Sequence, residues 1–141
     1  INAKGGDAVT RAYRERFQPS AREGASGALV CVFMICAETH ARAERLAASI
    51  DLRRLHMALN LDTPVPTLEE AERHVYAEEE RRYVLGQRDR AIIGGPEKCR
   101  REATALAERY GAEELMLLTI TGDYPSRLRS YELLARSFDL Q

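Results

Sequence analysis

Apolar residues follow two patterns along the chain, short continuous runs and stripes at helical spacing. The longest uncharged stretch extends from Ala25 to Ala37 and contains the run ALVCVFMICA. Because both faces of this segment are apolar, it predicts a strand covered on both sides, as in a parallel sheet or a β/α barrel. Two shorter runs, RAIIGG at residues 90–95 and Glu114 to Ile120, predict two further strands.

Helical stripes with recognisable caps separate these runs. Asp7 and Thr39 are candidate N-caps, and Thr67 with Glu70 matches the capping-box pattern. Pro96 suits the first position of a helix, where its missing N–H costs nothing. The predicted helices cover residues 7–17, 41–59, 68–87, 96–110 and 125–138.

The alternation of helices and strands predicts an α/β fold with parallel βαβ units. Three parallel strands leave two open edges, which exposed backbone groups make unfavourable. The chain also begins at Ile1 without an initiator Met. Together these features favour a domain that is part of something larger.

Composition narrows the possible partners. The chain has 141 residues, 45% of them apolar and 30% charged, with a net charge of -1. This balance gives no electrostatic case for binding nucleic acid or a membrane surface, and the longest apolar stretch is too short to cross a bilayer. Cys31, Cys36 and Cys99 form no CxxC motif and predict reduced, buried thiols in a cytoplasmic protein. Cys31 and Cys36 should face opposite sides of their strand and not pair.

No metal site is predicted. His40, His56 and His74 are scattered, and none stands at ligand spacing from a cysteine. The insert at residues 60–90 carries no readable chemical signature.

Gly94 and Gly95 lie between a predicted strand and a helix, at the sheet edge where α/β folds place ligands. A helix N-terminus there could offer free amides to an anion. However, Pro96 removes one amide, and Glu97 adds a negative charge. Ligand contact and tight turn both remain possible, and the residues favour the turn.

The segment TITGDYPSR supplies the other candidates for binding a cofactor or substrate. Thr119 and Thr121 share one face of the last predicted strand, and Asp123 lies beyond its carboxyl end. Polar residues that leave this end of a strand are good site candidates. Asp123 is equally suited to cap the following helix.

Longer motifs resemble one known family. The segment IIGGPEKCRREATALAERYGAEELMLLTITGDYPSRLRSYELLARSF is similar to the carboxyl-terminal end of luciferase-like flavin-dependent monooxygenases, where a G-[ST]-P-E turn opens a helix and Y-G-x-x-E-L-M leads into a strand. INAKGGDAVTRAYRERFQPS and ALVCVFMICAETHARAERLAAS resemble the family's segments around its fifth and sixth strands. The resemblance is loosest at residues 60–90. Gly95 departs from the usual Ser or Thr, and TGDYPSR replaces a loop that commonly contains His.

The resemblance implies that residues 1–141 form a partial (β/α)8 TIM barrel, roughly the last three β/α units, since a whole barrel needs about 250 residues. It implies reduced FMN supplied by a flavin reductase, oxygen and a small organic substrate, with the deazaflavin F420 as an alternative cofactor. Catalytic residues stay unassigned.

We expect this chain alone to be inactive and to bind FMN weakly or not at all. A missing amino-terminal barrel half, or self-association, should cover its open strand edges. The rival hypothesis is a non-catalytic interaction domain derived from the barrel.

Overall fold

The computed structural model describes residues 5–140, so the start of the chain at Ile1 lies outside the described residues. The strands are β1 (Leu29–Cys36), β2 (Ala91–Gly94) and β3 (Glu114–Leu118). The helices are α1 (Gly6–Arg16), α2 (His40–Ala58), α3 (Leu68–Arg73), α4 (Glu78–Gln87), α5 (Pro96–Tyr110) and α6 (Tyr124–Ser137), with a short 3-10 turn at Arg88–Arg90.

The three strands form one parallel sheet in the order β2-β1-β3. β2 pairs with the carboxyl-terminal half of β1, from Phe33 with Ala91 to Cys36 with Gly94, and β3 pairs mainly with its amino-terminal half. The parallel α/β prediction is confirmed.

The prediction of a barrel fragment is wrong. In a barrel built from consecutive β/α units, β2 would lie between its sequence neighbours. Here β1 is central and the sheet is open. β2 has only four residues, whereas β1 has eight. The longer strand pairs with β2 along one edge and with β3 along the other.

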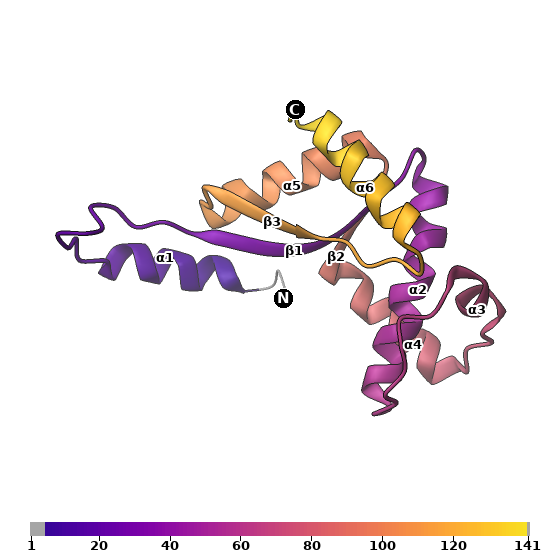
Figure 1. The fold of residues 1–141 in the computed structure, drawn as a ribbon. Helices are drawn as coiled ribbons and strands as arrows, with labels where there is room; N and C mark the ends of the chain where they lie inside the picture. The colour runs from indigo at the N-terminus through magenta and orange to yellow at the C-terminus, as the bar shows by residue number, and fades with distance from the viewer. Residues whose placement is uncertain (1–4, 141) are drawn as a thin grey trace.

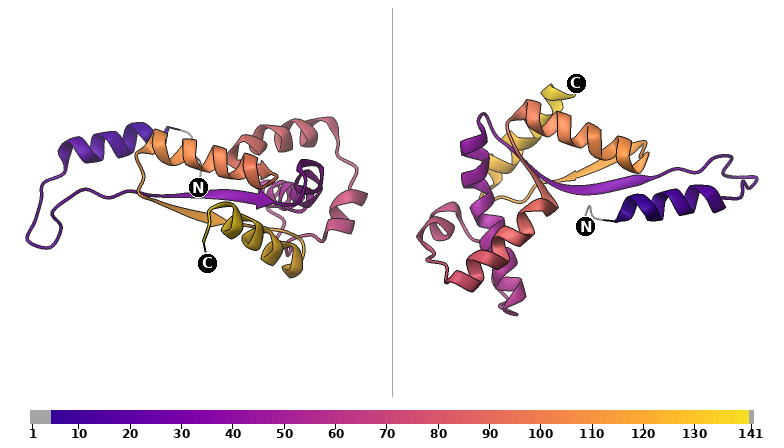
Figure 2. Two further views of the ribbon diagram at one scale, coloured as in Figure 1. Left: turned by 90° about the horizontal axis from the view of Figure 1, so that it is seen from above. Right: turned by 180° about the vertical axis from the view of Figure 1, so that it is seen from behind.

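One face of the sheet carries the main core. The alternating side chains Val30, Val32, Met34 and Cys36 of β1 are all buried in it. Helices α5 and α6 pack against each other over this face (Figures 1 and 2). Their buried contributions are Cys99, Ala103, Leu106, Tyr110, Leu133 and Leu134.

The opposite face is covered only towards its carboxyl end. There Ile35 and Ile93 pack with the buried residues of α2, and α2, α3 and α4 gather at that end of β1 (Figure 1). Towards the amino end, Leu29 is 51% exposed and Met116 on β3 is 54% exposed. The prediction that β1 is apolar on both faces holds, but half of its second face has no cover within the described residues.

Most helix ends form as their caps predict. The Thr39 hydroxyl accepts a hydrogen bond from the Arg42 amide, and the Thr67–Glu70 capping box is present. Gly111 ends α5 in the left-handed conformation, with φ of 57°. Asp7 is not an N-cap as predicted, because α1 begins one residue earlier with Gly5 as its cap.

The single helix predicted over residues 68–87 is instead two helices, α3 and α4. Ala71 and Val84 both pack into one cluster with Leu52 and Leu55 of α2. On one straight helix these two residues would point roughly 140° apart, at 100° per residue. The break lets both face α2, and the Ala77 amide donates to the Glu80 carboxylate at 2.9 Å where α4 begins.

Candidate functional site

The carboxyl edge of the sheet brings together the ends of its strands and the starts of the helices that follow them. The Cys36 end of β1 leads into α2, and the Gly94 end of β2 leads into α5. The segment after β3 enters α6 through the Asp123 cap. The predicted site residues are all near this edge, so their individual roles can be read from their contacts.

Gly94 and Gly95 form the turn between β2 and α5. Gly94 is buried and paired with Cys36 across the sheet, and a Cβ added to it would meet the Lys98 side chain at 2.7 Å. The Gly95 carbonyl accepts the Cys99 amide as α5 begins. These contacts are those of a tight strand-to-helix turn, with Pro96 at the start of the helix as predicted.

Thr119 is a structural residue. It is 2% exposed, and its hydroxyl donates to the Met34 carbonyl at 2.7 Å. Its amide donates to the Tyr131 hydroxyl at 3.2 Å. These bonds attach the chain beyond β3 to β1 and α6 and leave no hydroxyl proton for a ligand.

Thr121 and Asp123 are occupied with shaping the turn into α6. The Thr121 hydroxyl donates to the Asp123 carbonyl at 2.7 Å, and the Asp123 carboxylate accepts the Ser126 amide at 2.7 Å. The capping interpretation of Asp123 is therefore confirmed. Its second carboxylate oxygen and its exposed position still allow contact with a ligand.

A hollow of about 250 Å³ lies between the first turns of α2 and α6, and we call it the edge hollow. Its charged lining residues are Glu38, Arg42 and Arg129, with Cys36 at its wall. Arg129 is on the last helix, and nothing in the sequence indicates that it meets Arg42. The apolar remainder of the lining is Ala37, Leu46 and Pro125.

Arg129 is held in place by two carboxylates. Its Nε lies 2.7 Å from Glu38 Oε1, and its Nη1 lies 3.0 Å from Glu132 Oε2. The hydrogen bond from Arg129 lowers the pKa of Glu38, and the same bond raises the pKa of Arg129. Arg42, by contrast, forms no ion pair with any residue in the range 5–140, although its charge also contributes to the lowered pKa of Glu38. One cation of the edge hollow is thus available to an anionic group.

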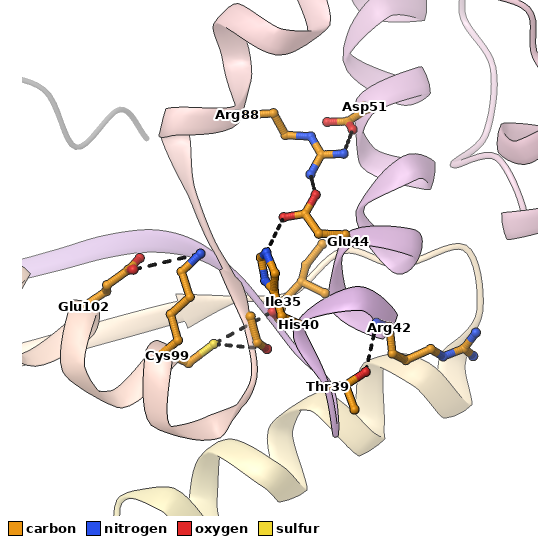
Figure 3. A network of polar contacts seen from close by, with 11 residues as sticks. Ile35, Thr39, His40, Arg42, Glu44, Asp51, Arg88, Cys99 and Glu102 are labelled. Carbon is orange, nitrogen blue, oxygen red and sulfur yellow. Dashed lines mark hydrogen bonds and ion pairs between the residues drawn. The ribbon is translucent and has the colours of Figure 1, made fainter.

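A second polar cluster lies on the other side of α2 (Figure 3). Arg88 contacts Glu44 Oε2 and Asp51 Oδ2, each at 2.6 Å, and His40 Nε2 lies 3.8 Å from Glu44. Asp51 is 3% exposed. Burial raises its pKa to about 6, against the opposing effect of Arg88.

Arg54 extends this cluster onto the half-covered sheet face. Its guanidinium carbon lies 5.3 Å from the centre of the Phe33 ring, a cation–π contact. Its Nη1 donates to the Gln87 carbonyl at 3.1 Å. Burial lowers the pKa of Arg54.

The buried Asp51 and Arg54 were not predicted. Three residues apart on one helix, they share a face with the apolar stripe of α2. The signal was their position inside that stripe, because charged residues are seldom buried without a partner.

The remaining features of the described region do not add a candidate site. A larger hollow, about 560 Å³, lies along β2 and α5, away from the carboxyl edge, and opens on one side of the sheet. Within residues 5–140 no three His, Cys, Asp or Glu side chains gather as metal ligands. None of the helices in that range is both long and apolar enough for a membrane span.

Comparisons place the chain beside longer proteins. YceB and YwcH, both uncharacterized proteins of Bacillus subtilis (strain 168), are 38% and 36% identical to it, each over 98% of this chain. This chain spans 42% of the length of each. The crystal structure of apo-MsnO8 matches 96% of this chain with a TM-score of 0.84 and 28% identity, and the match covers 41% of that protein.

The predicted luciferase-like assignment is corrected by these findings. No family model matches the chain, and one structural neighbour is MsnO8. The sheet itself is an open one of three strands rather than a segment of a barrel. The segments that suggested the family follow the general βα pattern, and a shared fold does not by itself fix family or function.

Proposed function

We propose that this chain forms one part of an oxidoreductase that uses reduced FMN and oxygen on a small organic substrate. The flavin phosphate would bind in the edge hollow. The observation that carries the proposal is the pair Arg42 and Arg129 at the carboxyl edge of a parallel sheet. Reduced FMN, delivered by a flavin reductase, supplies the electrons for oxygen when bound, and the protein supplies position and dry surroundings.

The size and charge of the edge hollow support a phosphate group. At about 250 Å³ it is smaller than the roughly 300–1,000 Å³ of pockets that enclose whole ligands. Arg42 forms no ion pair among residues 5–140, and Arg129, whose Nε and Nη1 contact Glu38 and Glu132, can add a contact through Nη2. The flavin ring would have to lie outside this hollow.

The half-covered sheet face, the side of the sheet on which Leu29 and Met116 lie, supports the view that further polypeptide completes the site. Leu29 and Met116 are more than half exposed there, and α1 leaves Val9 70% and Tyr13 45% exposed. Large exposed apolar side chains on these elements fit surfaces that bind further polypeptide. The relatives carry more than half of their length outside the match, and we assign the covering role to a segment equivalent to that remainder.

The test is flavin binding by a reconstituted complex. This chain would be co-expressed with the part of YceB that lies outside the match, and titrated with FMN and with riboflavin, which lacks the phosphate. We expect the complex to bind FMN at least about tenfold more tightly than riboflavin, the gain of one charge-assisted contact. Arg42→Gln should abolish that difference without changing riboflavin binding.

Arg136→Gln is the matched control, because Arg136 is an exposed arginine of α6 that does not line the edge hollow. It should leave both affinities unchanged. Equal binding of FMN and riboflavin by the unaltered complex would contradict the phosphate assignment. Tight stoichiometric FMN binding by this chain alone would contradict the need for a further segment.

Two rivals have separate outcomes. An F420-dependent oxidoreductase would show its absorption change with F420 rather than FMN in spectra of the same complex. A non-catalytic interaction domain is favoured by the exposed apolar face alone, and it would form the complex but bind neither cofactor.

We place the protein in the cytoplasm, and the three free cysteines support this.

A further inference from the structure

Two of the three cysteines meet at the carboxyl edge of the sheet. Cys36 is the last residue of β1, and Cys99 is in the first turn of α5. Both side chains belong to the core cluster on the face that α5 and α6 cover, and they are 1% and 0% exposed. They lie far apart in the chain, so only the βαβ crossover brings them together.

The backbone around Cys36 fixes the position of the Cys99 sulfur. Cys99 Sγ lies 3.6 Å from the Gly94 carbonyl oxygen and 3.9 Å from the Ile35 carbonyl oxygen (Figure 3). Ile35 precedes Cys36 directly, and Gly94 is the partner of Cys36 in the parallel register. The Cys99 sulfur therefore lies between two backbone carbonyls next to Cys36, that of Ile35 on β1 and that of Gly94 on β2.

The Cys36 and Cys99 thiols are close enough to interact with each other. That contact lowers the pKa of Cys36, against the opposing effects of burial and Glu38. The same contact, with burial, raises the pKa of Cys99. This difference gives the pair one potential thiolate and one proton-bearing thiol, the usual division between an attacking and a resolving cysteine.

Of the two sulfurs, only that of Cys36 belongs to a residue that lines the edge hollow. Cys36 lines the edge hollow, next to Arg42 and Arg129, whereas Cys99 is not among the residues that line it. A small neutral oxidant can enter the hollow, whose wall includes the 1% exposed Cys36. Cys31 lies on the other face of β1, because side chains alternate along a strand, and so cannot join the pair.

We propose that Cys36 and Cys99 form a redox-active dithiol that a hydroperoxide converts to an intramolecular disulfide. The Cys36 thiolate attacks one peroxide oxygen, and the O–O bond breaks to give a sulfenic acid and a hydroxide, which takes a proton to become water. The Cys99 sulfur then attacks the Cys36 sulfur, and the S–O bond breaks. The hydroxide that leaves takes the Cys99 proton to form a second water. In sum, two thiols and one hydrogen peroxide give one disulfide and two waters, with sulfur oxidised and peroxide oxygen reduced.

The disulfide would join the end of β1 to the first turn of α5 and remove the free thiol from the edge hollow. Since neither residue needs flavin for this chemistry, the pair is independent of the proposed function.

The test is hydrogen peroxide treatment of the purified 141-residue chain, followed by intact mass and non-reducing peptide mapping. We expect a mass lower by two hydrogen atoms, restored by dithiothreitol, and a peptide in which Cys36 is linked to Cys99. The variant Cys31→Ser should behave the same way and also removes the ambiguity that Cys31 and Cys36 share a tryptic peptide.

Two variants separate the roles. Cys99→Ser should halt the reaction at a Cys36 sulfenic acid that dimedone traps, and Cys36→Ser should leave Cys99 reduced under the same treatment. If the unaltered chain keeps both thiols, or if its crosslinks run through Cys31 or between two chains, the proposal is overturned. Because the first measurement uses the unaltered chain, the test stays decisive even where a variant folds poorly.

Discussion

Asp51 and Arg88 form a buried ion pair, with Asp51 Oδ2 and Arg88 Nη2 2.6 Å apart and the Asp51 side chain 4% exposed. The other Asp51 oxygen, Oδ1, has no hydrogen-bond partner among residues 5–140. Burial therefore outweighs the attraction of Arg88, and the pKa of Asp51 is raised from its usual 3.8 to about 6. A carboxyl held half-satisfied in this way costs stability whenever it is ionised.

The first prediction concerns pH. Between the unfolded pKa near 3.8 and the folded pKa of about 6, the folded state holds a proton that the unfolded state has released. The free energy of unfolding due to Asp51 thus falls as pH rises through this window, by at most about 3 kcal/mol. Denaturant unfolding of the unaltered chain and of Asp51→Asn at pH 4 to 7 measures the free energy of unfolding. This free energy should fall with rising pH in the unaltered chain, and Asp51→Asn should lack the part of the fall that is due to Asp51.

The slopes of the two curves are compared, because Asp51→Asn also shifts stability at every pH by removing one of the two carboxylates that contact Arg88. Glu44→Gln is the matched control, since Glu44 is the other carboxylate on Arg88 but is 42% exposed at its side chain. It should keep the slope of the unaltered chain. Parallel curves for the unaltered chain and Asp51→Asn would show that Asp51 titrates normally.

The second prediction concerns a close backbone approach. A Cβ added to Gly122 would meet the Pro66 carbonyl oxygen and Ser49 Oγ at 2.7 Å, and the Leu68 amide nitrogen at 2.8 Å. Because two of these atoms are backbone, they cannot move aside cheaply. Gly122→Ala should lower the free energy of unfolding by about 1–3 kcal/mol.

Gly86→Ala is the opposite case. Gly86 lies in α4, and a Cβ there has nothing within 4 Å. Alanine should stabilise the helix by about 0.5–1 kcal/mol. Thermal unfolding of both variants tests the pair, and equal effects would mean that the loop after β3 does not approach α2 this closely.

The sequence predicted local features well. Thr39, Thr67 with Glu70, and Gly111 all act as their residue types predict, because a cap depends on neighbours within one helical turn. The parallel sheet also followed from the alternation of apolar runs and stripes.

Long-range arrangement was beyond the sequence. Strand order depends on which edge of β1 each crossover reaches, and nothing within β3 encodes that choice. The break between α3 and α4 arises from packing of Ala71 and Val84 on α2 rather than from a Gly or Pro. Thr119 was a reasonable site candidate because it is polar and follows a strand, but its hydroxyl is buried against the Met34 carbonyl. Arg42 and Arg129 line the same hollow only because the fold places the starts of α2 and α6 side by side.

The third prediction separates capping from ligand binding at Asp123. Its carboxylate accepts the Ser126 amide at the start of α6. Asp123→Ala should therefore lower the free energy of unfolding by about 1 kcal/mol, whereas Asp123→Asn, which keeps a capping oxygen, should be close to neutral. Chemical denaturation of both variants measures this. A large loss in Asp123→Asn would show that the negative charge, and not the cap, is what the fold needs.

The fourth prediction tests the half-covered sheet face. Met116 is 54% exposed on β3 beside half-buried Cys31 of β1, so a charge placed there should block any surface that docks on it without disturbing the core. Met116→Glu should weaken binding to the co-expressed remainder of YceB by at least about tenfold, the equivalent of roughly 1.4 kcal/mol. It should also reduce any self-association of the chain alone, measured by sedimentation velocity. Val75→Glu is the control, because Val75 is 88% exposed but lies between α3 and α4, away from the sheet. A chain that stays monomeric at high concentration and forms an equally tight complex with either variant would show that this face is not where the covering segment binds.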